Sequence, residues 1–235
     1  MSTSAADLSA LFDAIDETGT ELVPTYNVAP TNVVPIVRSS ADERVMSLAR
    51  WGLVPSWAPD RSRAAKMINS RSETVASSRA FASSFTKRRC LVPVDGWYEW
   101  MRRAAGRKQP YFMTRHDGAA IGLAGIWSMW GSGDEAVMTF SVLTTAAVGD
   151  MRAVHDRMPL VLPERRWDGW LAHDRAPDPD ELLVPPTEAL VSEFELRPVG
   201  ARVGDVRNDD SELIQRVAAA PFGQPSEPPG ELSLF

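Results

Sequence analysis

The sequence predicts an α+β fold: a single domain with a twisted, barrel-like and mainly antiparallel β core and flanking short helices. Segments rich in β-branched and aromatic residues dominate the chain, and turn-forming residues separate them. The predicted helices are short, and no regular alternation of strand and helix indicates a parallel sheet. We therefore expect one domain over residues 1–220, followed by a disordered tail over residues 221–235.

The composition is that of an ordinary globular protein. Of 235 residues, 44% are hydrophobic and 24% are charged. No apolar run approaches the roughly 18 residues that span a bilayer, and no secretory signal is visible. The single cysteine, Cys90, excludes an internal disulfide and fits a reducing cytoplasm. The three histidines lack ligand spacing, so we expect no metal and no cofactor, and a monomer with no membrane segment.

The N-terminal third is expected to hold one helix and a pair of strands. Residues 4–16 are predicted to form an amphipathic helix, because the first residues resemble a capping box and apolar residues recur at helical spacing. A turn-rich loop follows at residues 26–31. Residues 33–37 and 44–51 are predicted to be strands joined by a polar turn.

The middle of the chain is expected to alternate loops, one helix and strands. Residues 61–67 form a basic loop, and residues 74–85 are predicted to be helical. Residues 90–101 and 111–115 are predicted to pair as a hairpin around the polar loop 102–109.

The C-terminal half contains the clearest hairpin. Residues 120–130 and 136–147 are rich in β-branched and aromatic residues, and a Gly-Ser-Gly-Asp turn separates them. Residues 163–172 are predicted to form a short helix with proline at its start. A late strand is expected at residues 194–199, and a last helix at residues 211–219.

Charge is distributed unevenly along the chain, although the net charge is −6. Residues 61–90 hold eight Lys and Arg against the single acid Glu73, whereas residues 172–235 hold five Arg against thirteen acids. An acidic protein can still present one strongly positive face that captures phosphates. The alternative is a basic helix that is simply solvated.

Three short segments are expected to meet in one polar pocket. Asn69, Arg71 and Glu73 alternate, and side chains two apart on an extended segment point the same way. The segments 96–100 and 155–159 supply further polar groups. We expect the three segments to form one polar pocket on the basic surface.

Glu99 and His155 are the candidate proton-transfer groups. Glu99 lies between tryptophan and tyrosine residues, and a carboxylate walled by rings is partly desolvated, which raises its pKa. The alternative is a strand glutamate that faces solvent. His155 lies in a predicted loop and could shuttle protons, although a lone histidine is often structural. The amide of Asn69 could orient a substrate carbonyl or hydroxyl.

Arginine and tryptophan side chains are candidate nucleic-acid contacts. The guanidinium forks of Arg71, Arg79 and Arg157 match phosphate oxygens. Trp51 and Trp57 could stack on bases, but a chain with eight tryptophans buries most of them, and Trp51 is expected in the core.

Cys90 is the one thiol in the sequence. Neighbouring arginines could lower its pKa. However, it enters an apolar strand, and cysteine is among the most buried residue types. We expect it to be buried and inert.

Five motifs together resemble the SRAP family, whose members are called SOS response-associated peptidases or abasic-site processing proteins. The resemblance covers about residues 5–220, and the motifs stand in the family's order and spacing: Tyr26-Asn27-Val28-Ala29-Pro30-Thr31, Trp51-Gly52-Leu53-Val54-Pro55-Ser56-Trp57, Asn69-Ser70-Arg71-Ser72-Glu73-Thr74, Asp95-Gly96-Trp97-Tyr98-Glu99-Trp100 and His155-Asp156-Arg157-Met158-Pro159.

The resemblance implies a barrel-like fold, binding of single-stranded DNA in the nucleoid and capture of abasic sites. The family nucleophile is a cysteine directly after the initiator Met; its amine forms a Schiff base with the sugar aldehyde, and its thiol then closes a thiazolidine. By resemblance, Asn69 orients the reacting groups, Glu99 handles protons at the amine, and His155 assists opening of the sugar ring. The implied DNA contacts are Asn27, Pro30, Trp57, Arg71, Arg79, Thr144 and Arg157.

The sequence departs from the family pattern at its start. The family begins M-C-G-R, but residue 2 here is Ser, and about half a dozen residues of the pattern precede Met1. We expect that the start is misassigned and that the true protein begins upstream, because Asn69, Glu99 and His155 all remain. The alternative is a chain without the nucleophile, which would bind DNA without durable cross-linking.

The last residues resemble the bacterial sliding-clamp-binding peptide. A Pro- and Gly-rich tether at residues 221–230 precedes them, and Leu232, Leu234 and Phe235 are the apolar positions that a clamp groove would take. The alternative is an incidental apolar tail.

Two other functions stay open at this point. One is a non-catalytic module that binds single-stranded DNA, which the missing N-terminal cysteine favours. The other is a peptidase that acts on proteins in trans, but no Ser-His-Asp order supports it.

Overall fold

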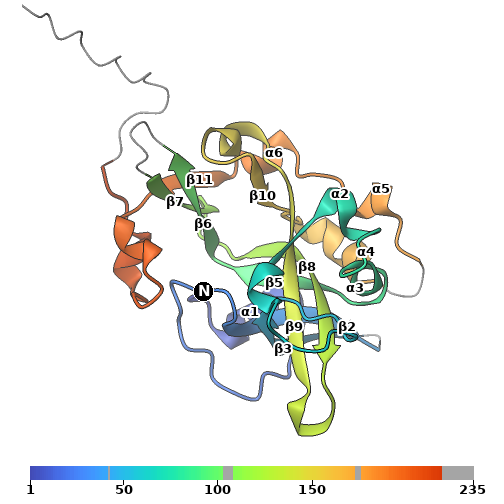
Figure 1. Cartoon of the computed structure of the whole chain (residues 1–235). Helices are drawn as coiled ribbons and strands as arrows, with labels where there is room; N and C mark the ends of the chain where they lie inside the picture. Colours follow the sequence, from blue (N-terminus) through green and yellow to red (C-terminus); the bar gives the residue numbers. More distant parts are fainter. Residues whose placement is uncertain (42, 103–107, 173–175, 219–235) are drawn as a thin grey trace, which may run out of the picture.

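The computed structural model describes residues 1–41, 43–102, 108–172 and 176–218, and these contain eleven strands in two sheets with short helices around them (Figure 1). The strands are β1 (Ile15–Asp16), β2 (Val33–Ser40), β3 (Glu43–Trp51), β4 (Asn69–Arg71), β5 (Arg89–Val94), β6 (Gly96–Arg102), β7 (Lys108–Arg115), β8 (Ile121–Trp130), β9 (Val137–Ala146), β10 (Arg157–Pro159) and β11 (Phe194–Pro198). The α-helices are α1 (Ala5–Phe12), α2 (Ser72–Val75), α3 (Ala82–Lys87), α4 (Trp167–Leu171), α5 (Pro179–Leu182) and α6 (Glu188–Val191).

The large sheet closes into a ring, which confirms the predicted barrel-like α+β fold. Its strands follow the order β1-β3-β2-β5-β8-β9-β10, and β4 also pairs with β9. Antiparallel pairs connect β3, β2, β5, β8 and β9. A short parallel pairing of β3 with β9, which sets Arg50 against Thr139 and Trp51 against Phe140, closes the ring. The β8–β9 hairpin is the one that the sequence predicts most clearly.

Side chains alternate between the two faces of a strand, and in β5 the side chains on both faces are buried. Cys90 and Val92 of β5 belong to the core cluster on one face. Leu91, between them, packs on the other face with Phe12 of α1 and Trp170 of α4. The helices α1, α3 and α4 therefore cover the outer face of the ring.

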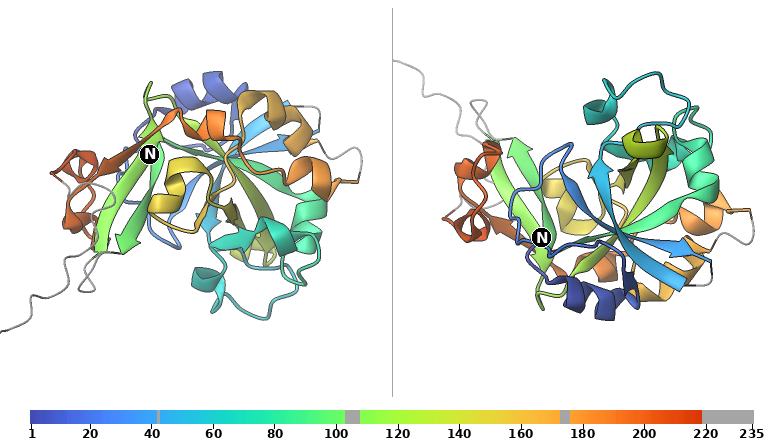
Figure 2. Two further views of the ribbon diagram at one scale, coloured as in Figure 1. Left: turned by 90° about the horizontal axis from the view of Figure 1, so that it is seen from above. Right: turned by 90° about the horizontal axis from the view of Figure 1, so that it is seen from below.

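The small sheet, in the order β11-β7-β6, lies to one side of the large sheet (Figure 2). The sequence predicts one strand over residues 90–101, but the chain passes from the large sheet to the small one after Val94. Gly96 permits this change: a Cβ atom there would lie 2.2 Å from the carbonyl oxygen of Met113, so only glycine allows the backbones to approach so closely.

Three predicted helices are shorter than expected. The helix expected over residues 4–16 ends at Phe12, because Asp13 takes a left-handed conformation, and Ile15–Asp16 instead pairs with β3 as strand β1. The segment 74–85 is two short helices, α2 and α3, and the hydroxyl of Ser77 donates to the carbonyl of Thr74 between them, a local bond that competes with the helix. The segment 163–172 begins as a 3-10 turn and becomes α-helical only at α4.

The expected last helix at residues 211–219 is wrong in most of its length. Within the described part of this segment, residues 211–218, only Ser211–Ile214 is helical, as a 3-10 turn. The chain then extends, and Val217 N–H donates to the carbonyl of Pro198 at 2.9 Å, so pairing with the end of β11 replaces the helix.

No helix in the described ranges is long and apolar enough to cross a membrane. Over the same ranges, no three His, Cys, Asp or Glu residues lie together in a way that could hold a metal ion.

Candidate active site

Strand β9 brings two of the three predicted segments together. β4 pairs with it in parallel, with Arg71 opposite Thr144, and β10 pairs with it antiparallel, with Pro159 opposite the same Thr144. Asn69 and Arg71 are both exposed, on the same face of β4. The predicted meeting of the segments 69–73 and 155–159 is therefore confirmed.

Arg157 joins these segments through its guanidinium group. Its Nη1 and Nη2 atoms donate to the two carboxylate oxygens of Glu73 at 2.6 and 3.0 Å. Nη2 also donates to the carbonyl of Thr144 at 2.6 Å and to its Oγ1 at 3.1 Å. Glu73 lies in α2 and not on β4, so the expected alternation of 69, 71 and 73 ends at Ser72, but its carboxylate still faces the site. The hydrogen bond from Arg157 lowers the pKa of Glu73.

Glu99 supplies a partly desolvated carboxylate to the same region. It lies on β6 opposite Tyr111 and is half-buried, so it does not stand in open solvent. Burial raises the pKa of Glu99, and the charge of Asp156 raises it further, while the charge of His155 opposes the shift. These interactions show that the carboxylate lies within electrostatic reach of the loop that carries His155, as the predicted pocket requires.

The imidazole of His155 is held by its own loop. Its Nδ1 lies 3.0 Å from the backbone nitrogen of Arg157, 3.1 Å from the carbonyl oxygen of Arg157 and 3.2 Å from a carboxylate oxygen of Asp156. Both oxygens are acceptors, so in the neutral tautomer that carries its proton on Nδ1 the imidazole donates to them and keeps its lone pair on Nε2. The side chain is 43% exposed.

Trp57 and Arg79 form one exposed pair beside the site. Trp57 is 57% exposed, and the guanidinium carbon of Arg79 lies 4.9 Å from the centre of its ring. Pro30 is exposed on a turn that is bound to the end of β3, where Thr31 N–H donates to the carbonyl of Trp51 at 2.8 Å. Trp51 is half-buried, and its Nε1 donates to the carbonyl of Ile68 at 2.9 Å, which fits the expected structural role.

Asn27 is a correction to the predicted set of DNA contacts. Its side chain is 9% exposed, and its Nδ2 donates to the backbone carbonyls of Val203, Asp205 and Asn208. Both amide protons are therefore engaged inside the protein. Asn27 therefore fastens the segment that contains Val203, Asp205 and Asn208.

Cys90 is fully buried, and burial raises the pKa of its thiol well above the ordinary range. The thiolate is therefore not accessible, as the sequence predicts. The clamp-binding prediction for Leu232, Leu234 and Phe235 lies outside the described residues.

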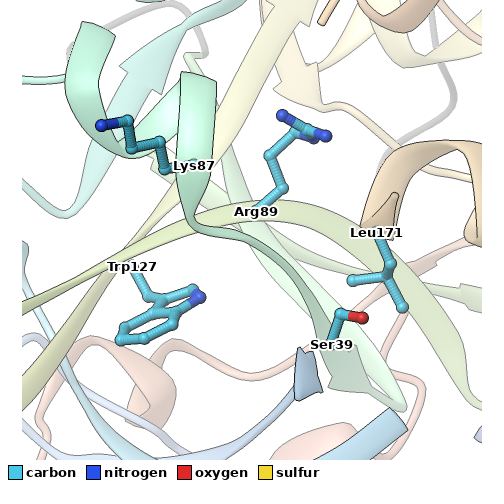
Figure 3. A pocket seen from close by; sticks show the side chains of 5 residues that line it. All are labelled: Ser39, Lys87, Arg89, Trp127 and Leu171. Atoms are coloured by element: carbon cyan, nitrogen blue, oxygen red, sulfur yellow. The ribbon is translucent and has the colours of Figure 1, made fainter. Parts of the chain in front are cut away.

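Two hollows lie away from these groups. An open one of about 520 Å³ is lined by Arg44, Glu164, Arg165 and Asp168. A smaller cavity of about 60 Å³ is shown in Figure 3 and is lined by Ser39, Lys87, Arg89, Trp127 and Leu171. In Figure 3 the guanidinium of Arg89 turns away from Trp127, because it donates to backbone carbonyls that include those of Phe85 and Trp170. Neither hollow contains a candidate site residue.

Sequence reasoning missed the role of Glu73 as the partner of Arg157. Two charges 84 positions apart carry no pairing information in one sequence, and only the topology of β4, β9 and β10 brings them together. The pairing of exposed Arg61 with half-buried Trp130, whose ring centre lies 5.4 Å from the guanidinium carbon, was also not predicted.

The fold of this chain is also found in solved structures. A crystal structure of a protein from Bacteroides thetaiotaomicron matches with a TM-score of 0.81 and 25% identity, over 93% of this chain and 98% of that one. A protein from Bordetella bronchiseptica matches with a TM-score of 0.65 and 26% identity, over 83% of this chain and 95% of that one.

The chain belongs to the SOS response associated peptidase (SRAP) family, whose sequence model matches residues 1–206. Among its relatives, the abasic site processing protein YoaM of Bacillus subtilis is 33% identical over 83% of this chain and 86% of its own. The abasic site processing protein YedK of Escherichia coli is 33% identical over 84% and 86%. The abasic site processing protein HMCES of Gallus gallus is 32% identical over 81% of this chain and 66% of its own.

Proposed function

We propose that this protein binds single-stranded DNA and processes abasic sites in it. The observation that carries the proposal is the half-buried carboxylate of Glu99, on which the charge of His155 acts, and the exposed Trp57–Arg79 pair elsewhere on the same domain adds a surface for DNA. The relatives named above are abasic site processing proteins, which supports the same substrate.

The chemistry begins with the sugar of an abasic site, whose ring-opened form carries an aldehyde. His155 accepts the proton of the sugar hydroxyl at Nε2 as the ring opens, in the tautomer that carries its own proton on Nδ1, and the 43% exposure of the side chain suits this step. The amide of Asn69 is exposed on β4 and makes no hydrogen bond in the described part of the chain, so it is available to orient the sugar.

Glu99 then acts as the acid in the reaction of an amine with the aldehyde carbon. The amine nitrogen bonds to that carbon, the carbonyl oxygen becomes a hydroxyl, and an acid must protonate this hydroxyl before it leaves as water and the imine forms. Because burial raises the pKa of Glu99, its carboxyl group keeps a proton to higher pH than an exposed glutamate and is suited to donate it.

The durable product is proposed to be a thiazolidine formed through an N-terminal cysteine. Cys90 is excluded because it is buried and has no free α-amine. Asp95, just before β6, holds the N-terminal segment. Its carboxylate accepts hydrogen bonds from the hydroxyls of Ser2 at 2.8 Å and Thr3 at 2.7 Å.

This placement directs the N-terminal segment toward the site. Glu99 lies four residues beyond Asp95, about 13 Å along an extended strand. Half a dozen extended residues before Met1 would span at most about 20 Å and could reach it. A form that begins M-C-G-R upstream could thus present its cysteine amine to Glu99.

The test compares two forms on a denaturing gel with single-stranded DNA that carries one abasic site. One form has the sequence printed here, and the other has the upstream M-C-G-R sequence restored. We expect a heat-stable shifted band with the restored form, and its loss when the new cysteine is changed to alanine. A heat-stable band of equal intensity with both forms would contradict the role of the cysteine. No band with either form, despite native-gel binding, would contradict abasic-site processing.

The second candidate is a non-catalytic module for single-stranded DNA, because Ser occupies position 2 and the one cysteine is buried. That module would bind intact and abasic strands equally, and Glu99→Gln would change neither affinity. A third, a peptidase that acts on other proteins, requires no DNA, so salt-sensitive DNA binding that Arg71→Ala weakens would count against it.

A further inference from the structure

We propose that Arg61 and Trp130 form a second contact for the DNA strand and extend its path from Trp57 to the end of the β8–β9 hairpin. The inference rests on the proposed function, because it assumes that the strand crosses the exposed basic surface. It adds two binding residues from a loop and a hairpin that lie far apart in the sequence.

The two cation–aromatic pairs are direct neighbours. Trp130 ends β8, and its Nε1 donates to the carbonyl of Ala58 at 2.8 Å. Ala58 follows Trp57, so this bond fixes one tryptophan beside the other. Arg79 covers Trp57 at 4.9 Å and Arg61 covers Trp130 at 5.4 Å, measured from each guanidinium carbon to the ring centre.

The loop that carries these residues is fastened to β9 at its base. Gly52 N–H donates to the carbonyl of Phe140 at 2.8 Å, and Val54 N–H donates to Oγ1 of Thr139 at 2.9 Å. The loop then leads directly into Asn69. Trp130 pairs with Val137 at the start of β9, and Thr144 lies seven residues further on, about 23 Å along the strand. The loop over residues 52–68 therefore connects the candidate site with the hairpin, over a length of several nucleotides.

The cations of this surface are not neutralised. Elsewhere arginines pair with acids, as Arg38 does with Glu17 and Arg115 with Asp117. Over the described ranges, no ion pair occupies the four cations of the loop and its neighbour, Arg61, Arg63, Lys66 and Arg79. Asp60 is the one acid among residues 52–68; hydrogen bonds from Ser62 hold it, and of the four cations only Arg63 acts on its charge.

Free guanidinium groups beside tryptophan rings are the combination that binds single strands. Bases stack on aromatic faces whatever their identity, while cations track the phosphates. Beyond Trp130 the hairpin turn carries Asp134 and Glu135, both exposed, which repel phosphate. These two acids mark the outer end of the proposed DNA-binding surface, so only a limited number of nucleotides can contact it.

The test measures affinity by fluorescence anisotropy with single strands that carry a stable abasic analogue. The strands are lengthened stepwise on the 5′ side in one series and on the 3′ side in the other. We expect the unchanged protein to gain affinity with length on one side only. Arg61→Ala should remove that gain, with a loss of about tenfold on long strands and no change on short ones.

The variants separate the contact from the fold. Trp130→Phe keeps a ring but loses the bond to Ala58, and we expect an intermediate loss. Arg165→Ala is the matched control, because it removes one exposed positive charge at the distant open hollow. Equal behaviour of Arg61→Ala and Arg165→Ala on long strands would overturn the inference. Absence of cross-linking by the restored M-C-G-R form on every strand would instead refute the proposed function.

Discussion

Replacing Glu99 with Gln should separate activity from stability. The change keeps the shape of the side chain and a hydrogen-bonding group but removes the titrating proton. If Glu99 is the acid that protonates the departing hydroxyl, the rate of abasic-site capture should fall by about 10²–10⁴-fold, the usual contribution of a general acid or base.

The same change should not destabilise the protein at neutral pH. Burial raises the pKa of Glu99 above its ordinary value of 4.5, so the folded protein holds that proton to higher pH than the unfolded chain. The free energy of unfolding therefore falls as pH rises from 4.5 through the folded pKa. Glu99→Gln removes this loss, so the variant should be at least as stable as the unchanged protein at pH 8, with no such gain below pH 4.5.

Glu73→Gln is the matched control, because the pKa of Glu73 is shifted in the opposite direction from that of Glu99. Arg157 lowers the pKa of Glu73 below 4.5, so this contribution is present above pH 4.5 and is lost as pH falls through the folded pKa. The side chains of Arg157 and Glu73 are 23% and 49% exposed, so solvent screening limits the contribution to about 1 kcal/mol or less. At pH 8 the control should lower Tm by at most about 2–4 °C.

The assay pairs thermal unfolding at pH 4 and pH 8 with single-turnover capture by the restored M-C-G-R form. Glu99→Gln should lose activity and keep its Tm at pH 8. Two results would refute the assignment of Glu99 as a desolvated acid. One is full activity of this variant. The other is a Tm difference, variant minus unchanged protein, that is more negative at pH 8 than at pH 4.

Three other changes test separate parts of the account. Arg79→Ala should weaken binding of single-stranded DNA about tenfold and reduce the salt dependence measured by anisotropy, because it removes a cation and uncovers Trp57; unchanged salt dependence would exclude a phosphate contact. Asn27→Ala should lower stability by about 1–3 kcal/mol in denaturant unfolding, because three carbonyls lose their donor, and should leave the salt dependence unaltered; a stable variant with weak DNA binding would restore Asn27 as a DNA contact. Changing Leu234 and Phe235 to Ala should abolish pull-down of the bacterial sliding clamp, and retained pull-down would mean that the tail is incidental.

The sequence was most informative where structure is local. The cap of α1 follows from Ser4, whose hydroxyl accepts from Asp7 N–H at 3.1 Å, and the β8–β9 hairpin follows from its composition and turn. The sequence placed Glu99 and His155 in one predicted pocket, and the charge of His155 does act on the Glu99 carboxylate, while the roles given to both residues stay predictions.

Long-range pairing explains what the sequence did not reveal. The closure of the ring by β3 and β9 and the partnership of Arg157 with Glu73 join segments 84 or more positions apart. Asn27 was misassigned because its partners lie about 180 residues further along the chain. For Arg157 and Asn27, a polar side chain that suits a ligand was bound instead by a distant part of the same chain.

The most direct test of the central claim is borohydride trapping of an imine. The restored M-C-G-R form, after removal of its initiator Met, is mixed with single-stranded DNA carrying one abasic site, with and without prior acetylation of its N-terminal amine. The account predicts a reduced, covalent complex that acetylation abolishes and that Glu99→Gln forms far more slowly. A complex that survives acetylation, or none while native-gel binding is intact, would contradict it.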